Sequence, residues 1–263
     1  FQGIDVQALD ALAKSAITDK HHTKSIKPAP SRKLEKQVPL IDCFTAPCQE
    51  TCPIHQDIPT YVELAGEGKF LEALRVITDK NPLPFITGTI CPHGCMGKCT
   101  RNYYEEPVHI RDVKLLSAQH AFADLMKELE TPKTVSNAKV AIVGGGPAGL
   151  AAAYFLGRAG IHCTIFDKHE SLGGIVRHII PDFRITAEAI EHDVALVAKM
   201  GAEFKLGVEV GSVQELKDQG YDYVILAVGA WKHGNVRLEK GEAVNVFEFL
   251  SGFKQNASQL NLG

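Results

Sequence analysis

A glycine-rich turn joins two patterns that together can bind the phosphates of a nucleotide. The apolar run 140–143 leads directly into Gly144-Gly145-Gly146-Pro147-Ala148-Gly149. A helical pattern follows to Gly160, and a second apolar run, 163–166, ends at Asp167. An ordinary glycine-rich turn between a strand and a helix would not require the acid at the end of the next strand. The full pattern therefore favours a G-x-G-x-x-G dinucleotide site.

Each residue of this pattern has an expected task. Gly144 permits the tight turn, Gly146 lets a pyrophosphate approach the backbone, and Gly149 lets the helix pack against the strand. The free N–H groups and the dipole at the start of the helix then attract the phosphates. Asp167 is expected to accept hydrogen bonds from the adenosine ribose.

The cysteines form a second group with chemical potential. Six of the seven cysteines lie in two runs, Cys43-x4-Cys48-x3-Cys52-Pro53 and Cys91-Pro92-His93-Gly94-Cys95-x3-Cys99. Zinc sites commonly use C-x2-C pairs, and none is present. Thiols without a metal would not be expected to cluster so closely. We therefore favour iron–sulfur ligation, which suits these spacings and the Cys-Pro pairs. Cys163, alone in the second apolar run, is expected to be a core residue.

The composition excludes several classes of function. A net charge of -3 gives no electrostatic attraction to nucleic acid or anionic membranes. No apolar run is long enough to span a bilayer. No signal peptide is visible, and clustered cysteines of this kind are typical of metal binding in the cytoplasm. Residues 1–3 resemble the remainder of a protease-cleavable tag and are left out of the fold prediction.

The elements that must position the cysteines are helical. Residues 4–40 are expected to form a short helix at 4–14 and an extended arm. The cysteine-rich region, 41–133, is expected to contain a helix at 60–79 that is broken or loosened at Gly66 and Gly68, then the proline-rich turn NPLPF. A second helix is expected at 113–129, with one apolar face of Leu115, Ala118, Phe122, Leu125, Met126 and Leu129.

Residues 134–263 alternate strands with helices, which predicts a parallel sheet. A helix capped by Thr186, a strand at 204–210, a helix at 213–219 and a strand at 223–228 follow the glycine-rich unit. No second G-x-G-x-x-G is present, so one dinucleotide site is expected. The predicted fold class is α+α/β, with a helical cysteine-rich iron–sulfur domain before a Rossmann-like domain.

The sheet region resembles flavoproteins of the glutathione-reductase type, because Gly173-Gly174 follows Asp167 and a strand ends at Gly229. The whole chain from residue 38 resembles the flavoprotein family of the glutamate synthase small subunit and the amino-terminal part of dihydropyrimidine dehydrogenase. Three motifs carry this resemblance, and they are closest to selenate reductase iron–sulfur flavoprotein subunits: DCFTAPCQETCPIHQDIP, NPLPFITGTICPHGCMGKCTR and GGIVRHIIPDFRI.

The resemblance implies FAD and two 4Fe-4S clusters. It assigns one cluster to Cys43, Cys48 and Cys99 and the other to Cys52, Cys91 and Cys95. The residues expected to bind FAD are Gly144, Gly146, Pro147, Ala148, Gly149, Leu150, Asp167, Lys168, Gly173, Gly174, Ile175, Arg184, Val210 and Gly229. Arg184 is expected to pair with the phosphates or the flavin, although it could also be an exposed surface arginine. No catalytic residue is assigned.

Two positions depart from the relatives. Leu40 stands where they have a further cysteine, and Lys114 stands where they have Gln or Glu. Each cluster is therefore expected to be one ligand short and labile. The relatives continue into an NAD(P)H-binding domain, so the chain is expected to be a fragment that works with that domain and with other electron-transfer subunits.

The expected function is an electron-transfer module of an oxidoreductase that passes electrons between FAD and iron–sulfur clusters. The alternative is a non-catalytic, metal-stabilised docking module with an empty nucleotide site.

Overall fold

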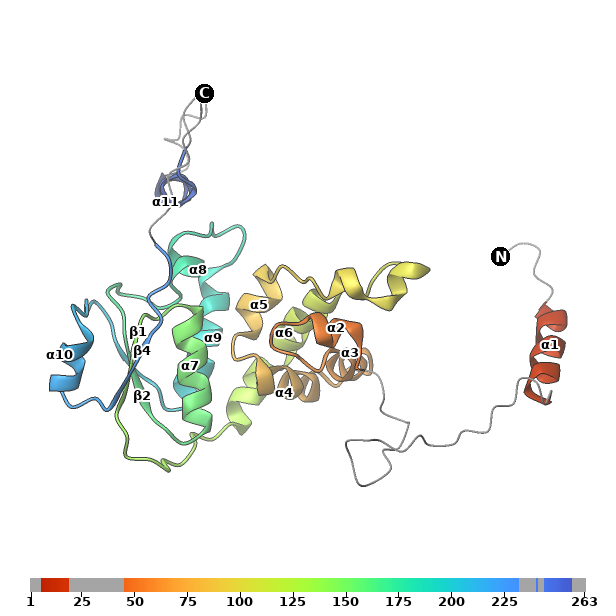
Figure 1. The fold of residues 1–263 in the computed structure, drawn as a ribbon, viewed down its shortest axis with the longest axis horizontal. Coiled ribbons are helices and arrows are strands. Elements are labelled where there is room, and N and C mark those ends of the chain that lie inside the picture. The colour runs from red at the N-terminus through yellow and green to blue at the C-terminus, as the bar shows by residue number, and fades with distance from the viewer. Residues whose placement is uncertain (1–5, 19–44, 232–239, 241–243, 257–263) are drawn as a thin grey trace, which may run out of the picture. The chain divides into compact units, whose positions relative to one another are not determined.

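The computed structural model describes residues 6–18, 45–231, 240 and 244–256. The chain divides into two compact units, residues 1–45 and 46–263. The first unit contains helix α1 (Val6–Thr18), which overlaps the helix expected at 4–14 and continues beyond it (Figure 1). The expected extended arm and Cys43 lie outside the described residues.

The first half of the larger unit is helical, as its sequence predicts. Its elements are α2 (Pro47–Thr51), α3 (Ile58–Gly66), α4 (Phe70–Lys80), α5 (Pro84–Ile90), η2 (Met96–Lys98), η3 (Thr100–Tyr103) and α6 (Ile110–Glu128). The helix expected at 60–79 is two helices, because the chain turns at Gly68, whose φ is +77°. Of the expected NPLPF turn, residues 81–83 lie outside any helix, and Pro84 and Phe85 begin α5. Pro84 is tolerated there because a helix does not use the N–H groups of its first turn.

The second half is a parallel sheet with the strand order β3-β2-β1-β4. Its strands are β1 (Val140–Val143), β2 (Cys163–Phe166), β3 (Glu203–Lys205) and β4 (Tyr223–Leu226), and its helices are α7 (Pro147–Arg158), α8 (Ile175–His178), α9 (Ala187–Lys199), α10 (Val213–Asp218) and α11 (Val246–Asn256). In the register, Val140 pairs with Cys163 on one side and Tyr223 on the other. The predicted α+α/β fold is confirmed.

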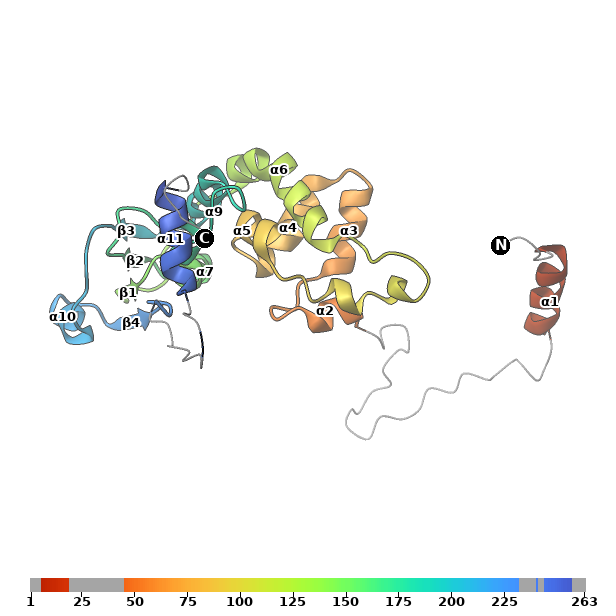
Figure 2. The same cartoon turned by 90° about the horizontal axis from the view of Figure 1, so that it is seen from above.

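The two faces of the sheet are covered by different helices. Because side chains alternate along a strand, Ile142 of β1 packs in the large core that α7 and α9 complete, whereas Ala141 packs with Leu216 of α10. Figure 2 shows α10 on one side of the strands and α7 and α9 on the other. This arrangement leaves the ends of the strands free.

Two strands differ from the prediction. β3 ends at Lys205, because the chain turns away at Gly207 (φ +67°) before the apolar positions that follow. The apolar run of β4 predicts a buried strand, yet Tyr223 and Leu226 are each 63% exposed. It is the last strand of the described sheet, so one of its sides has no neighbouring strand among the described residues.

A single hydrophobic core runs from the helical half into the sheet half. Helix α5 packs against α9 between the halves (Figure 1). The Tyr154 hydroxyl of α7 donates to the carbonyl oxygen of Thr78 at 3.1 Å, and Arg158 pairs with Asp79 at 2.9 Å. The cysteine-rich half and the sheet half are therefore held as one body. None of the described helices is long and apolar enough to cross a membrane.

Candidate functional site

A cavity of about 600 Å³ lies at the carboxyl-terminal edge of the sheet. The strands are parallel, so the residues that follow each of them meet at this edge. β1 lies between β2 and β4, where the strand order reverses, and such a switch point is the usual ligand position in open α/β sheets. The cavity volume is within the range of small-molecule sites.

The glycine loop makes room for a ligand and for the packing beneath it. A Cβ at Gly149 would lie 1.9 Å from the Gly144 carbonyl oxygen, and a Cβ at Gly144 would lie 2.4 Å from that of Ala227. These two glycines are needed by the fold itself. The space beside Gly146 is different, because a Cβ there would meet no described atom closer than Gly174 Cα at 3.7 Å. A Cβ at Gly146 would thus make only an ordinary van der Waals contact, and Gly146 lines the cavity at the start of α7, where a phosphate could approach.

Asp167 ties the glycine loop to the end of β2. One carboxylate oxygen accepts the Gly145 N–H at 2.7 Å, and the other accepts the His169 N–H at 2.8 Å and lies 2.9 Å from His169 Nδ1. Burial acts to raise the pKa of Asp167, but these hydrogen bonds outweigh it and hold the pKa below its ordinary value. A charged, 7% exposed carboxylate therefore lines the cavity.

The structure separates the residues expected to bind FAD into two groups. Those that line the cavity are Gly144, Gly146, Pro147, Ala148, Asp167, Lys168, Gly174, Ile175, Val210 and Gly229. Gly149 and Leu150 are buried in the packing of α7, and the Gly173 N–H donates to the Gly145 carbonyl oxygen at 2.8 Å. Arg184 is exposed and does not line the cavity.

Aromatic side chains form one wall of the cavity, which the sequence did not predict. The ring of His169 stacks on His178 with centroids 4.2 Å apart and lies 5.4 Å from that of Trp231. The Lys168 ammonium lies 5.9 Å from the Trp231 ring centre. Burial lowers the pKa of His178, and the neighbouring His169 acts in the same direction. The sequence offered one signal for this wall, because Trp231 lies only two positions after Gly229, which was expected to bind the cofactor.

Short elements gather the described cysteines. Cys48 lies in α2 and Cys52 follows it, Cys91 follows α5, and Cys95 and Cys99 flank η2. Helix α2 contacts η2, so the two cysteine runs meet. All five are half-buried free thiols.

Electrostatic interactions divide these thiols into two overlapping groups. Burial raises the pKa of Cys48, and its interactions with Cys99 and Cys52 raise it further. Burial also raises the pKa of Cys95, with Cys91 and Cys52 acting in the same direction. Cys48 is thus near Cys99, and Cys95 near Cys91 and Cys52.

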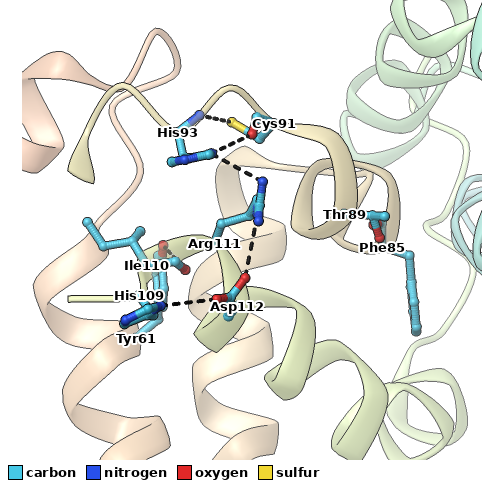
Figure 3. A network of polar contacts seen from close by, with 9 residues as sticks. All are labelled: Tyr61, Phe85, Thr89, Cys91, His93, His109, Ile110, Arg111 and Asp112. Carbon is cyan, nitrogen blue, oxygen red and sulfur yellow. Dashed lines mark hydrogen bonds and ion pairs between the residues drawn. The ribbon is translucent and has the colours of Figure 1, made fainter. Parts of the chain in front are cut away.

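The chain bends sharply after each Cys-Pro pair. His55 and His93 have φ values of +46° and +44°, a region that side-chain-bearing residues rarely adopt. The His93 N–H donates to Cys91 Sγ at 3.4 Å, and its Nδ1 lies 3.0 Å from the Cys91 carbonyl oxygen and 3.2 Å from an Arg111 nitrogen (Figure 3). This bend directs a backbone donor at the thiol, as thiolate sulfur in a cluster requires.

The surroundings of the thiols suit an anionic group. Arg111 Nε is buried and makes no hydrogen bond in the described part of the chain, although it lies 3.5 Å from Asp112 Oδ1. Lys114 is only 5% exposed and has no such acidic partner among the described residues. Buried cations require a negative partner. No three His, Cys, Asp or Glu side chains in the described ranges are placed to share one metal ion. A 4Fe-4S cluster spreads its thiolates around a larger body than one ion, so half-buried thiols beside buried cations fit it.

Comparison with known proteins identifies the family. Residues 24–125 match dihydropyrimidine dehydrogenase domain II, 4Fe-4S cluster, and residues 142–196 match the NAD(P)-binding Rossmann-like domain. The chain is 33% identical to the small chain of NADPH glutamate synthase of Escherichia coli (strain K12), over 99% of this chain and 56% of that protein. These similarities support the placement of the chain in the family of the glutamate synthase small chain and dihydropyrimidine dehydrogenase.

Other relatives connect this glutamate synthase small chain family with further proteins. The chain is 39% identical to YgfK of Escherichia coli (strain K12), over 99% of this chain and 26% of that protein. It is 37% identical to the NADPH-Fe(3+) oxidoreductase subunit beta of Geobacter sulfurreducens (strain DL-1 / KN400), over 81% of this chain and 32% of that protein. The chain thus spans between about a quarter and about half the length of these relatives.

Proposed function

We propose that this chain is the electron-transfer module of a cytoplasmic NAD(P)H-dependent oxidoreductase, of the selenate reductase or glutamate synthase type. FAD would occupy the cavity, and two 4Fe-4S clusters would bind the cysteines. When bound, FAD exchanges a pair of electrons as hydride and the clusters carry single electrons. The nicotinamide site would lie in a partner domain or subunit.

The observation that carries this proposal is the joining of a dinucleotide cavity and an array of thiols in one packed body. The same core includes Leu150 beneath the glycine loop, and Cys52 and Cys95 of the thiol array pack against it. Two cofactor sites held by one core keep a fixed separation, which suits electron transfer between them. We take 41–133 as the iron–sulfur domain and 134–263 as the FAD domain.

The residues of the cavity supply each part of a dinucleotide site. The backbone near Gly146 and the start of α7 would bind the pyrophosphate. Asp167 would accept the ribose hydroxyls with the lone pairs that Gly145 and His169 leave free. The wall of His169 and Trp231 offers a planar surface to an aromatic ring of the cofactor. The pairing of Arg184 with the phosphates or the flavin stays a prediction, because Arg184 does not line the cavity.

The proposed cluster ligands are the two sets that the family resemblance implies, although Cys52 interacts with thiols of both sets. Cys48 and Cys99 would act with Cys43, and Cys52, Cys91 and Cys95 would act together. The half-buried positions keep the thiols accessible enough to be loaded while limiting water around them. Each set supplies three thiolates, so one iron of each cluster lacks a cysteine ligand.

Anaerobic purification tests the proposal directly. We expect bound FAD, and iron and acid-labile sulfide equivalent to up to two clusters, with the iron lost from a parallel sample handled in air. Cys95→Ser should lower the iron content. Its matched control, Cys163→Ser, should leave iron unchanged, since Cys163 lies in β2.

Two results would contradict the proposal. Stoichiometric zinc with neither iron nor flavin would indicate the docking module instead. Steady NADPH:acceptor turnover by the 263-residue chain alone would show that the nicotinamide site is present within it.

A further inference from the structure

Lys114 is a buried cation whose role the cofactor sites described so far leave open. It lies on α6, is 5% exposed, and makes no side-chain hydrogen bond or ion pair with any residue that the structure describes. Lysine is almost never fully buried unless it is paired, because an ammonium loses strong hydration. Its position therefore requires an explanation.

The titratable side chains that interact with Lys114 include three thiols. Burial lowers the pKa of Lys114, while interactions with Cys91, Cys52 and Cys95 oppose this and the nearby Arg111 adds to it. Arg111 precedes Lys114 by three positions, so the two cations share one face of α6. The face of α6 toward this group of thiols is thus positively charged.

The buried carboxyl group in range does not satisfy this charge. Asp193 interacts with Lys114, but both of its oxygens already accept backbone N–H groups of α5, from Phe85 and Ile86. Arg111 has a carboxylate partner, because its Nε lies 3.5 Å from Asp112 Oδ1, whereas Lys114 forms no ion pair with a described carboxylate.

We propose that Lys114 is the counter-cation of an anionic group bound by Cys52, Cys91 and Cys95. This inference rests on the proposed function, in which that group is an iron–sulfur cluster. Three thiolates give such a cluster a net negative charge, and reduction makes the charge more negative. A buried cation stabilises the more negative state more strongly, so Lys114 raises the reduction potential of this cluster. It acts as a positioning residue and not as a ligand.

The test is an EPR-monitored redox titration of the anaerobically reconstituted 263-residue chain. Lys114→Met removes the charge with little change in length, and Lys114→Arg keeps it. Lys127→Met is the matched control, because Lys127 lies on the same helix, is exposed, and pairs only with Asp124 at 2.8 Å among the described residues. The second cluster in the same sample is an internal reference.

We expect Lys114→Met to shift one of the two signals to lower potential. A tenfold change in the ratio of oxidised to reduced cluster at a fixed potential corresponds to about 59 mV for one electron. Lys114→Arg and Lys127→Met should keep the wild-type potential. Loss of this cluster in the Met variant with retention in the Arg variant would support the same role.

The contrary results are distinct. Equal cluster content and equal potential in wild type and Lys114→Met would overturn the role of Lys114 and leave the proposed function standing. Loss of the cluster in both Met and Arg variants would overturn the charge argument. Failure of the wild-type chain to take up any iron and sulfide would overturn both proposals.

Discussion

The carboxylate of Asp193 accepts the backbone N–H of Ile86 at 2.7 Å, although the two residues lie in different halves of the larger unit. Its other oxygen accepts the N–H of Phe85 at 3.1 Å. The first N–H groups of a helix have no partner within that helix, so α9 completes the start of α5. Because Cys91 directly follows α5, this contact also helps to position a thiol of the array.

Removal of this contact should be costly. Asp193→Ala would leave two buried N–H groups without acceptors, and we expect it to lower the free energy of unfolding by about 3 kcal/mol. Urea denaturation measures this. Glu188→Gln, an exposed change on the same helix, should stay within about 0.5 kcal/mol of wild type. Similar midpoints for Asp193→Ala and Glu188→Gln would show that the contact contributes little.

Asp193 should also give stability a particular dependence on pH. Burial raises its pKa to about 8, which the two backbone donors only partly offset. The folded state therefore keeps a proton that the unfolded state releases above about pH 4. This contribution to stability is complete below that pH and is lost as the pH rises to about 8. Unfolding measured from pH 5 to 9 should show a steeper decline for wild type than for Asp193→Asn. Parallel curves for the two proteins would contradict this assignment.

Two glycines of the loop should separate binding from folding. Gly146→Ala places a methyl group at the cavity in only van der Waals contact with Gly174, so we expect normal thermal stability without cofactor but loss of most bound FAD. Gly149→Ala places its methyl group against the Gly144 carbonyl oxygen and should lower both the thermal stability and the amount of bound FAD. Gly66→Ala is the control, because its Cβ would meet no atom within 4 Å. Flavin content and melting temperature are the measurements, and full flavin occupancy in Gly146→Ala would place the phosphates elsewhere.

Asp167→Ala should weaken FAD binding by about 1.5–3 kcal/mol, since a ribose would lose a charged acceptor. This corresponds to a dissociation constant raised about ten- to a hundredfold, measurable by flavin fluorescence on dilution. The change also frees the N–H groups of Gly145 and His169, so loop stability should fall. Asp218→Ala, a change at an exposed position of α10, is the control for loss of a negative charge. An unchanged dissociation constant would assign the ribose to other residues.

In the metal-free protein, Lys114→Met should raise the melting temperature. Replacing a buried charged group by an apolar side chain of similar length is expected to stabilise by about 1–4 kcal/mol when the charge lacks a good partner. Calorimetry of chelator-treated protein measures this, with Lys127→Met as the exposed control. A lower melting temperature for Lys114→Met would mean that the ammonium already has a stabilising partner without any cluster.

The sequence predicts those parts of the fold that local signals control. The runs 140–143 and 163–166 are strands as expected, because apolar residues bounded by glycine and by Asp167 leave few alternatives. Thr186 caps α9, as its residue type indicates, by accepting the Ala189 N–H at 3.3 Å. Helices α5 and α8 were not predicted, since each is too short to show a periodic pattern.

Features set by packing were less accessible from sequence. The apolar pattern of α6 points Leu115 and Phe122 toward the core, but the structure also buries Lys114 and Ser117 beside them. A polar residue can be buried when residues distant in the sequence supply its hydrogen-bond partners, and no local sequence pattern identifies those residues. For the same reason the sequence did not indicate that Asp193 is buried, since its hydrogen-bond partners are more than a hundred positions away.

The continuous core has a consequence for the cooperativity of the molecule. Ile77 in the helical half and Leu196 behind the sheet belong to one buried cluster. Segments that share a core open together, so amide exchange in α4 and α9 should follow the same global unfolding event. Loss of iron at the thiols would then increase exchange at the floor of the nucleotide cavity as well, with no ligand contact between the two sites.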